Sequence, residues 1–401
     1  MKRTATHLRW PAALLAASLL LLSACGGGDS SPSVPPPVVV PPDEVEVTGP
    51  GELKDATRVN TLPLADITAA VHAPENKLYP ATPLYAVTSY RLTYVTKDSQ
   101  GRDIVASGLV SVPVKASGAR SPVIGYQHGS IFKDADAPSN NVVASEPTAV
   151  IASLGYIVVA ADYVGFGASR GVPHPYLLSA PTASAVVDLL TAAKTWRRRN
   201  SVTDNGQLFL VGYSEGGYAT MAAHRALQAA NSPHLAQLAG SVAGAGPYHL
   251  GVTLDALLDR VRDEYPVLGG LLSPGLLRYL GSDVRNEVRR LLMRAVIPDD
   301  ADVTFESTFV DNYLADDNDA IERDSNVHDW KPALPVRMFH GRDDQTVPYA
   351  AATRTLQTMQ ARGASTATLA DCSATPSSHL GCVQPYFAYL MGQLSAVARD
   401  L

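Results

Sequence analysis

The chain has 401 residues, of which 46% are hydrophobic and 17% are charged, a balance ordinary for a soluble enzyme. This length allows two or three average domains, or a single α/β domain that carries insertions. The formal net charge of −6 argues against nucleic acid as a partner.

The first residues have the pattern of an export signal. Three basic residues lie within the first nine positions and precede an apolar run at 12–22, which is too short to span a bilayer. The run ends in Leu22-Ser23-Ala24-Cys25, which resembles the lipobox of bacterial lipoproteins. We therefore expect residues 1–24 to be a signal peptide and Cys25 to carry a lipid that anchors the protein in a membrane, with the outer membrane favoured. The alternative is an ordinary secretory signal.

Residues 25–50 are mostly Gly, Ser, Pro and Val and predict a semi-rigid tether rather than a folded segment. The predicted globular domain, residues 51–401, opens with two alternating segments at 85–96 and 103–114. A polar turn separates them, so they predict an antiparallel hairpin.

After the hairpin, short apolar segments alternate with helical patterns, and this order predicts parallel βαβ units in one sheet. The predicted strands are 123–127, 156–161, 208–211, 239–245 and 336–340, and the predicted helices are 182–198, 218–227 and 384–401. Residues from about 250 to 330 interrupt the alternation with amphipathic helices and an acidic stretch. We expect this insertion to form a cap over the carboxyl edge of the sheet; the alternative is a peripheral helical elaboration.

The run Gly212-Tyr213-Ser214-Glu215-Gly216 lies between a predicted strand and a predicted helix. A serine hydroxyl is a weak nucleophile at neutral pH, so catalysis requires an exposed serine with a base and oxyanion donors close by. Two glycines let the strand and the helix approach closely around the serine. The run therefore predicts a nucleophile at Ser214.

Candidates for the acid and the base follow the serine in the chain. Asp343 and Asp344 come after the predicted strand that ends at His340, and we favour Asp344 for its offset from that strand. His379 is the only histidine after Asp344 and lies in a polar loop before the last helix. The sequence therefore predicts Asp344 as the acid and His379 as the general base.

The chain has three cysteines, and two of them, Cys372 and Cys382, flank His379. With Cys25 assigned to the lipid, these two form an even pair in an oxidising setting, which predicts a disulfide. Such a crosslink would restrict the position of His379.

Two backbone N–H groups are needed for the oxyanion. One is expected from Glu215 at the helix start, with its side chain in a hydrogen bond of the first turn. The other is expected from Gly129 or Ser130, and we favour Ser130. No convincing metal site and no cofactor motif are present.

Taken together, these residues resemble the α/β-hydrolase superfamily and, within it, the secretory lipase family. The resemblance rests on five segments: 126–129, 162–167, 174–177, 212–217 and 244–248. It implies a mostly parallel central sheet flanked by helices, a helical cap between strands six and seven, and ester hydrolysis through an acyl-enzyme with a Ser214–His379–Asp344 triad.

Three functions compete at this point. The first is a carboxylesterase or lipase acting on a small-molecule or lipid ester. The second is another serine hydrolase on the same scaffold, either a peptidase or an esterase for feruloyl or acetyl groups of polysaccharides. The third, a non-enzymatic binding lipoprotein, is disfavoured because every triad candidate is present. The acyl-chain length is left open.

Overall fold

The computed structural model describes residues 46–73, 81–265 and 273–401, and Val47–Leu401 form one compact unit. The predicted signal peptide, Cys25 and most of the predicted tether lie outside the described residues. Within the described ranges, none of the helices is both long enough and apolar enough to cross a membrane.

Nine strands of the described chain form one sheet, in the order β1-β2-β3-β5-β4-β6-β7-β8-β9. The first three strands and β5 pair antiparallel, whereas β5, β4 and the strands from β6 to β9 pair parallel. This confirms the predicted hairpin and the mostly parallel sheet. The strands are β1 (Leu53–Leu62), β2 (Val87–Lys97), β3 (Asp103–Pro113), β4 (Ser121–Gln127), β5 (Ile157–Ala161), β6 (Asp204–Tyr213), β7 (Leu238–Gly244), β8 (Val336–His340) and β9 (Ala367–Asp371).

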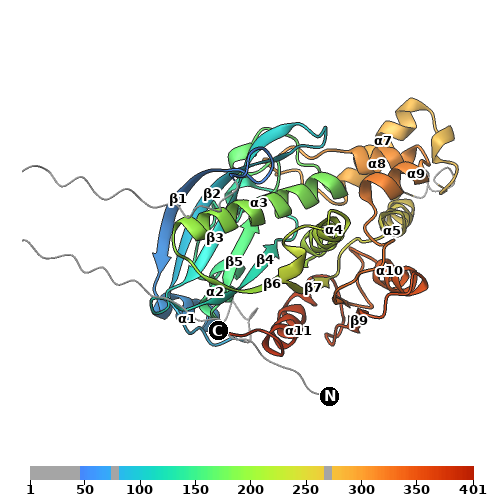
Figure 1. Cartoon of the computed structure of the whole chain (residues 1–401). Helices are drawn as coiled ribbons and strands as arrows, with labels where there is room; N and C mark the ends of the chain where they lie inside the picture. Colours follow the sequence, from blue (N-terminus) through green and yellow to red (C-terminus); the bar gives the residue numbers. More distant parts are fainter. Residues whose placement is uncertain (1–45, 74–80, 266–272) are drawn as a thin grey trace, which may run out of the picture. The chain divides into compact units, whose positions relative to one another are not determined.

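Helices cover both faces of this sheet (Figure 1). On one face, α3 and α4 pack on the central strands, and on the other face α2 and α11 do so. The strand β5 is fully buried, as expected for a strand covered on both sides. The helices outside the insertion are α1 (Leu64–His72), α2 (Pro147–Ser153), α3 (Ser179–Arg199), α4 (Glu215–Ala229), α10 (Tyr349–Ala361) and α11 (Val383–Ser395).

The insertion lies between β7 and β8 and is helical, as predicted. Its helices are α5 (Leu250–Glu264), α7 (Ser282–Arg294), α8 (Thr308–Leu314) and α9 (Asn318–Ala320). Leucines of α5 and α7 pack with Phe309 of α8 and with Tyr218 of α4 in one buried cluster. The cap therefore shares a core with the sheet-covering helices. The sequence predicts the cap between the sixth and seventh strands. In the structure the cap follows the seventh strand, because the sequence patterns did not predict β1 and the structure counts it as the first strand.

The structure also contains elements that the sequence patterns did not predict. The edge strand β1 is mostly polar and exposed, so it lacks an alternating apolar pattern. The last helix ends at Ser395 instead of Leu401, because the chain beyond it bonds to the body: Asn205 Nδ2 donates to the Arg399 carbonyl at 2.9 Å.

Candidate active site

Ser214 occupies a sharp turn between the end of β6 and the start of α4. Its backbone has φ 61° and ψ −124°, a conformation that residues with a side chain rarely adopt. The flanking glycines make the turn possible. A Cβ at Gly212 would lie 2.3 Å from the Gly216 carbonyl oxygen, and one at Gly216 would lie 2.0 Å from the Gln127 carbonyl oxygen. The serine is therefore held at the strand–helix junction by backbone contacts that only glycine permits.

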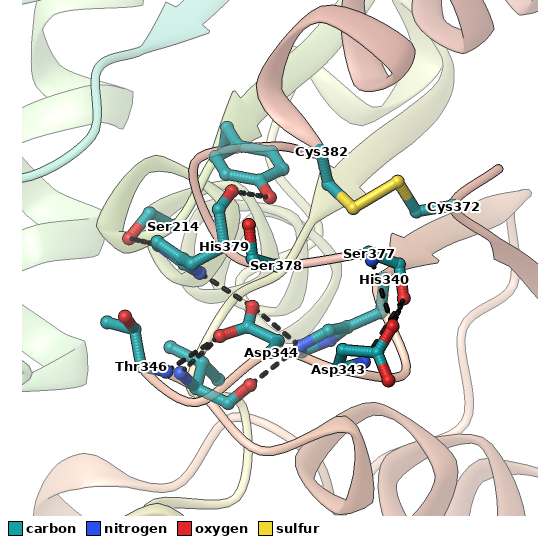
Figure 2. Close-up of polar contacts among 12 residues, drawn as sticks. Ser214, His340, Asp343, Asp344, Thr346, Cys372, Ser377, Ser378, His379 and Cys382 are labelled. Atoms are coloured by element: carbon teal, nitrogen blue, oxygen red, sulfur yellow. Dashed lines mark hydrogen bonds and ion pairs between the residues drawn. A yellow bond between two sulfur atoms is a disulfide. The ribbon is translucent and has the colours of Figure 1, made fainter. Parts of the chain in front are cut away.

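Figure 2 shows Ser214, His379 and Asp344 in one hydrogen-bonded chain. His379 Nε2 lies 2.8 Å from Ser214 Oγ, and His379 Nδ1 lies 2.6 Å from Asp344 Oδ2. The three residues come from the β6–α4 turn, the loop before α11 and the loop after β8. The structure thus brings together the three residues that the sequence predicts as nucleophile, base and acid.

The Asp344 carboxylate is buried and fully engaged. Its Oδ1 accepts from the backbone N–H groups of Thr346 and Val347 at 2.8 and 2.9 Å. Its Oδ2 contacts His379 and also lies 3.3 Å from His340 Nε2. Burial raises the pKa of Asp344, but the hydrogen bonds from His340, His379 and the backbone outweigh it and lower that pKa well below its usual range. Asp344 is therefore ionised near neutral pH.

The neighbouring Asp343 has a different role from Asp344. Its carboxylate accepts hydrogen bonds from the backbone N–H and the hydroxyl of Ser377, both at 2.9 Å. This contact ties the loop after β8 to the loop that carries His379. The predicted disulfide between Cys372 and Cys382 is also present, with a Cα–Cα distance of 5.9 Å. The histidine loop is therefore fixed at several points (Figure 2).

Tyr213, the residue before the nucleophile, also holds the histidine loop. Its hydroxyl donates to the backbone carbonyl of His379 at 2.7 Å, and the two rings lie 5.3 Å apart. The strand that presents Ser214 therefore also positions the base that faces it.

The two predicted oxyanion donors lie beside Ser214. Glu215 is the first residue of α4, where a backbone N–H has no partner within the helix. The loop after β4 passes close to the nucleophile, because a Cβ at Gly129 would lie 3.7 Å from Ser214 Cβ. Ser130 follows in that loop, and its hydroxyl lies 2.9 Å from the Tyr176 hydroxyl. Both donors line the same cavity as Ser214.

The side chain of Glu215 differs from the sequence expectation. It does not cap the first turn of α4: its Oε1 lies 2.9 Å from His174 Nε2, and both side chains are buried. His174 Nδ1 lies 2.7 Å from the Val164 carbonyl, which only accepts, so Nδ1 carries a proton. The Nε2–carboxyl contact ties the first residue of α4 to the loop that precedes α3. The expectation failed because the partner lies 41 residues earlier in the chain.

Ser214 and His379 open into a cavity of about 620 Å³ between the sheet and the cap. Most of its wall is apolar, and the cap supplies much of it. The apolar cap residues in the wall are Leu250, Leu254, Leu257, Ala295, Val296 and Phe309. The charged residues of the wall from outside the triad are Glu146, Glu215 and Arg260. In the described ranges, no cluster of three or more His, Cys, Asp and Glu side chains is arranged to hold a metal ion.

The family model of the secretory lipases matches residues 139–381, which include the serine turn, the cap, the acid and the histidine. The chain belongs to the secretory lipase family. This membership indicates an ester-hydrolysing, exported enzyme and confirms the resemblance read from the sequence. None of the curated proteins matches this chain significantly.

Solved structures with the same fold support the architecture of this chain. The rice cell wall degrading esterase LipA from Xanthomonas oryzae is 23% identical, with 88% of this chain and 100% of that chain covered and a TM-score of 0.66. A Legionella pneumophila protein described as a hydrolase is 22% identical, with 86% and 97% covered and a TM-score of 0.66. Candida antarctica lipase A is 16% identical, with 83% and 78% covered and a TM-score of 0.51. At these identities the likeness shows the fold.

Sequence reasoning missed several residues that shape the site. His340 was placed on a strand without a role, yet its ring reaches the acid. His174 belongs to a segment that carries the family resemblance, but its pairing with Glu215 follows from the tertiary fold. Arg260 lies on the cavity side of a cap helix, and only the apolar spacing of that helix could have indicated which face turns inward.

Proposed function

We propose that this secretory lipase hydrolyses carboxylic esters through an acyl-enzyme on Ser214, with His379 as general base and Asp344 as its orienting acid. The observation that carries the proposal is the hydrogen-bonded chain from Ser214 Oγ through both nitrogens of His379 to Asp344 Oδ2. It opens into a cavity large enough for an ester.

The mechanism follows from the direction of these contacts. His379 Nε2 takes the proton from Ser214 Oγ as the oxygen attacks the ester carbonyl. Asp344 holds the proton on Nδ1 and stabilises the imidazolium that forms. The backbone N–H groups of Glu215 and Ser130 stabilise the tetrahedral oxyanion. His379 then protonates the departing alcohol, activates a water molecule against the acyl-enzyme, and returns the proton to Ser214.

The apolar wall of the cavity supports an apolar acyl or alcohol group in the substrate. A second candidate substrate is an acyl ester on a plant cell wall polysaccharide. Its support is the likeness to an esterase described as rice cell wall degrading. A peptidase on the same scaffold is the third candidate.

A panel of substrates separates these candidates. Nitrophenyl esters from acetyl to palmitoyl are assayed beside methyl ferulate, acetylated xylan and a peptide anilide, with wild type and Ser214→Ala. We expect turnover of nitrophenyl esters that is lost in Ser214→Ala. Faster cleavage of the anilide would favour a peptidase, and faster cleavage of the ferulate or xylan would favour the polysaccharide esterase.

We further propose that the enzyme is a lipoprotein with a signal peptide at 1–24, a lipid on Cys25, a tether at 25–50, and a hydrolase domain at 51–401 whose cap spans about 250–330. The support is the lipobox-like sequence and the composition of the segment that follows. In bacterial cells fed an alkyne fatty acid, wild type should take up the label and sediment with membranes. Cys25→Ala should do neither; unchanged sedimentation of Cys25→Ala would contradict the anchor.

A further inference from the structure

Arg260 lies on the face of the cap helix α5 that turns toward the catalytic serine. Five residues of this helix line the cavity, at spacings of three and four: Leu250, Thr253, Leu254, Leu257 and Arg260. Residues at this spacing share one face of a helix. Arg260 is the last member of an otherwise mostly apolar stripe, so its guanidinium belongs to the same wall as the leucines.

Within residues 46–73, 81–265 and 273–401, the Arg260 side chain forms no hydrogen bond or ion pair. Its Nε is buried and makes no hydrogen bond within the part of the chain that the structure describes. Four acidic residues lie on α5. Asp255 accepts from the Tyr313 hydroxyl at 2.8 Å, and Asp259 binds Arg262 at 2.9 Å. Asp263 and Glu264 are exposed and form no ion pair with Arg260 in the described residues. A buried donor on a cation costs free energy unless a partner satisfies it. In the described part of the chain, Arg260 Nε has no such partner.

The other charged groups of the cavity do not neutralise Arg260. Glu215 is paired with His174 at 2.9 Å, and Glu146 accepts from Asn141 Nδ2 at 2.9 Å. Burial lowers the pKa of Arg260, and the nearby charge of Asp344 opposes this effect. An arginine nevertheless keeps its proton. Arg260 is therefore a cation whose buried Nε–H lacks an acceptor among the described residues, in a mostly apolar cavity.

We propose that Arg260 binds a carboxylate carried by the ester substrate, so that this enzyme prefers esters with an anionic substituent over neutral esters of the same length. A planar guanidinium donates two parallel hydrogen bonds to a carboxylate, and the low dielectric of the cavity strengthens them. The apolar stripe of α5 would contact the uncharged part of the same molecule. The proposal rests on the proposed function, because it takes Ser214 as the group that attacks the ester.

Matched substrate pairs test this preference on both sides of the ester bond. For the acyl side the pair is monoethyl adipate and ethyl 6-hydroxyhexanoate; for the alcohol side it is 4-acetoxybenzoate and 4-acetoxybenzamide. The ratio of kcat/KM, anionic over neutral, is measured for wild type, Arg260→Gln, Arg260→Lys and Arg262→Gln. Arg262 lies on the same helix and pairs with Asp259, so its variant controls for the loss of a charge from α5.

We expect the ratio for wild type to be at least about tenfold for one pair, since a charge-assisted hydrogen bond is worth at least that factor. The pair that shows it identifies the side of the ester that carries the carboxylate. The ratio should fall to about one in Arg260→Gln, mainly through KM, stay intermediate in Arg260→Lys and remain at the wild-type value in Arg262→Gln. High salt should reduce the ratio in wild type.

Two results would overturn the proposal: a ratio at or below one for both pairs in wild type, or a ratio that Arg260→Gln does not change. Adipate, as a competitor of nitrophenyl butyrate, tests whether Arg260 serves only to hold a carboxylate product. If adipate inhibits wild type but not Arg260→Gln, and neither substrate pair shows a preference, then Arg260 binds a carboxylate product and not the substrate. That result would contradict the proposal. Failure of the proposed function is separate, because Ser214→Ala would then still hydrolyse nitrophenyl butyrate.

Discussion

His340 Nε2 lies 3.3 Å from Asp344 Oδ2, the carboxylate oxygen that also contacts His379. The same Nε2 lies 2.9 Å from the Val347 carbonyl, which only accepts, so this nitrogen carries the proton. His379 therefore contacts Asp344 Oδ2 through Nδ1, while the Nε2–H of His340 donates to the Val347 carbonyl and lies close to the same carboxylate oxygen. His340 is a positioning residue in this arrangement: it stabilises the carboxylate without facing the cavity.

Removal of the His340 N–H should weaken the catalytic contribution of Asp344 without abolishing it. In His340→Phe the pKa of Asp344 should rise toward its usual range, and kcat should fall by about tenfold with little change in KM. His340→Gln, whose amide can still donate, should recover part of the loss. Steady-state kinetics with a nitrophenyl ester at pH 7 checks this. Equal losses in both variants would indicate a packing effect only.

Asp344→Asn should be far more damaging than Asp343→Asn. An amide at position 344 can favour the wrong tautomer of His379, and the comparable change in other serine hydrolases lowers kcat by about 10⁴. Asp343 contacts Ser377 rather than the base, so its variant should lose stability before activity. The measurement is kcat beside the thermal midpoint for each variant. A larger loss of kcat in Asp343→Asn would reverse the assignment of the acid.

The order of candidate residues along the chain was sufficient to predict most of this site. The serine turn, the acid after a strand and the last histidine could be placed because each depends on local sequence and on the order of the elements. Other features of the site depend on how distant segments pack together. These are the Glu215–His174 pair, the approach of His340 to Asp344, and the position of Arg260 in the cavity wall. The strand β1 escaped prediction because its residues are mostly polar and exposed, which leaves no apolar period to detect.

The Cys372–Cys382 disulfide should stabilise both the fold and the position of His379. Closing a loop of this length contributes on the order of 3 kcal/mol by restricting the unfolded chain. Cys372→Ser with Cys382→Ser should therefore unfold several degrees earlier and lose activity in parallel. Reductant should do the same to wild type and have no further effect on the double variant. Wild-type activity and midpoint in that variant would contradict the proposed support of the base.

Gly216→Ala should destroy the serine turn. Its Cβ would lie 2.0 Å from the Gln127 carbonyl oxygen, so β4 or α4 must shift, at a cost of about 1–3 kcal/mol. Because Ser214 sits on that junction, activity should fall by more than the loss of stability explains. Gly392→Ala is the matched control, since nothing lies within 4 Å of its added Cβ in α11. The unfolding free energies and kcat of the two variants are compared, and equal behaviour would contradict the close-approach argument.

The protein should lose stability between pH 6.5 and about 4. Burial lowers the pKa of His224, His234 and His249 to about 4 in the folded chain, against about 6.5 in the unfolded chain. The unfolded state therefore binds more protons in this window, and the free energy of unfolding falls as the pH falls. The slope contributed by a fully buried histidine approaches about 1.4 kcal/mol per pH unit. Urea unfolding at several pH values measures it, and His224→Phe should reduce the slope; a midpoint independent of pH would contradict the prediction.

The most direct test of the central claim is the identity of the residue that an organophosphate modifies. Diethyl p-nitrophenyl phosphate is added to wild type until esterase activity is lost, and the labelled peptide is found by mass spectrometry. We predict one diethylphosphoryl group per chain, on Ser214, with loss of activity in proportion to labelling and no label in Ser214→Ala. A label on another residue, or full esterase activity in a chain whose Ser214 is completely labelled, would contradict the Ser214 acyl-enzyme.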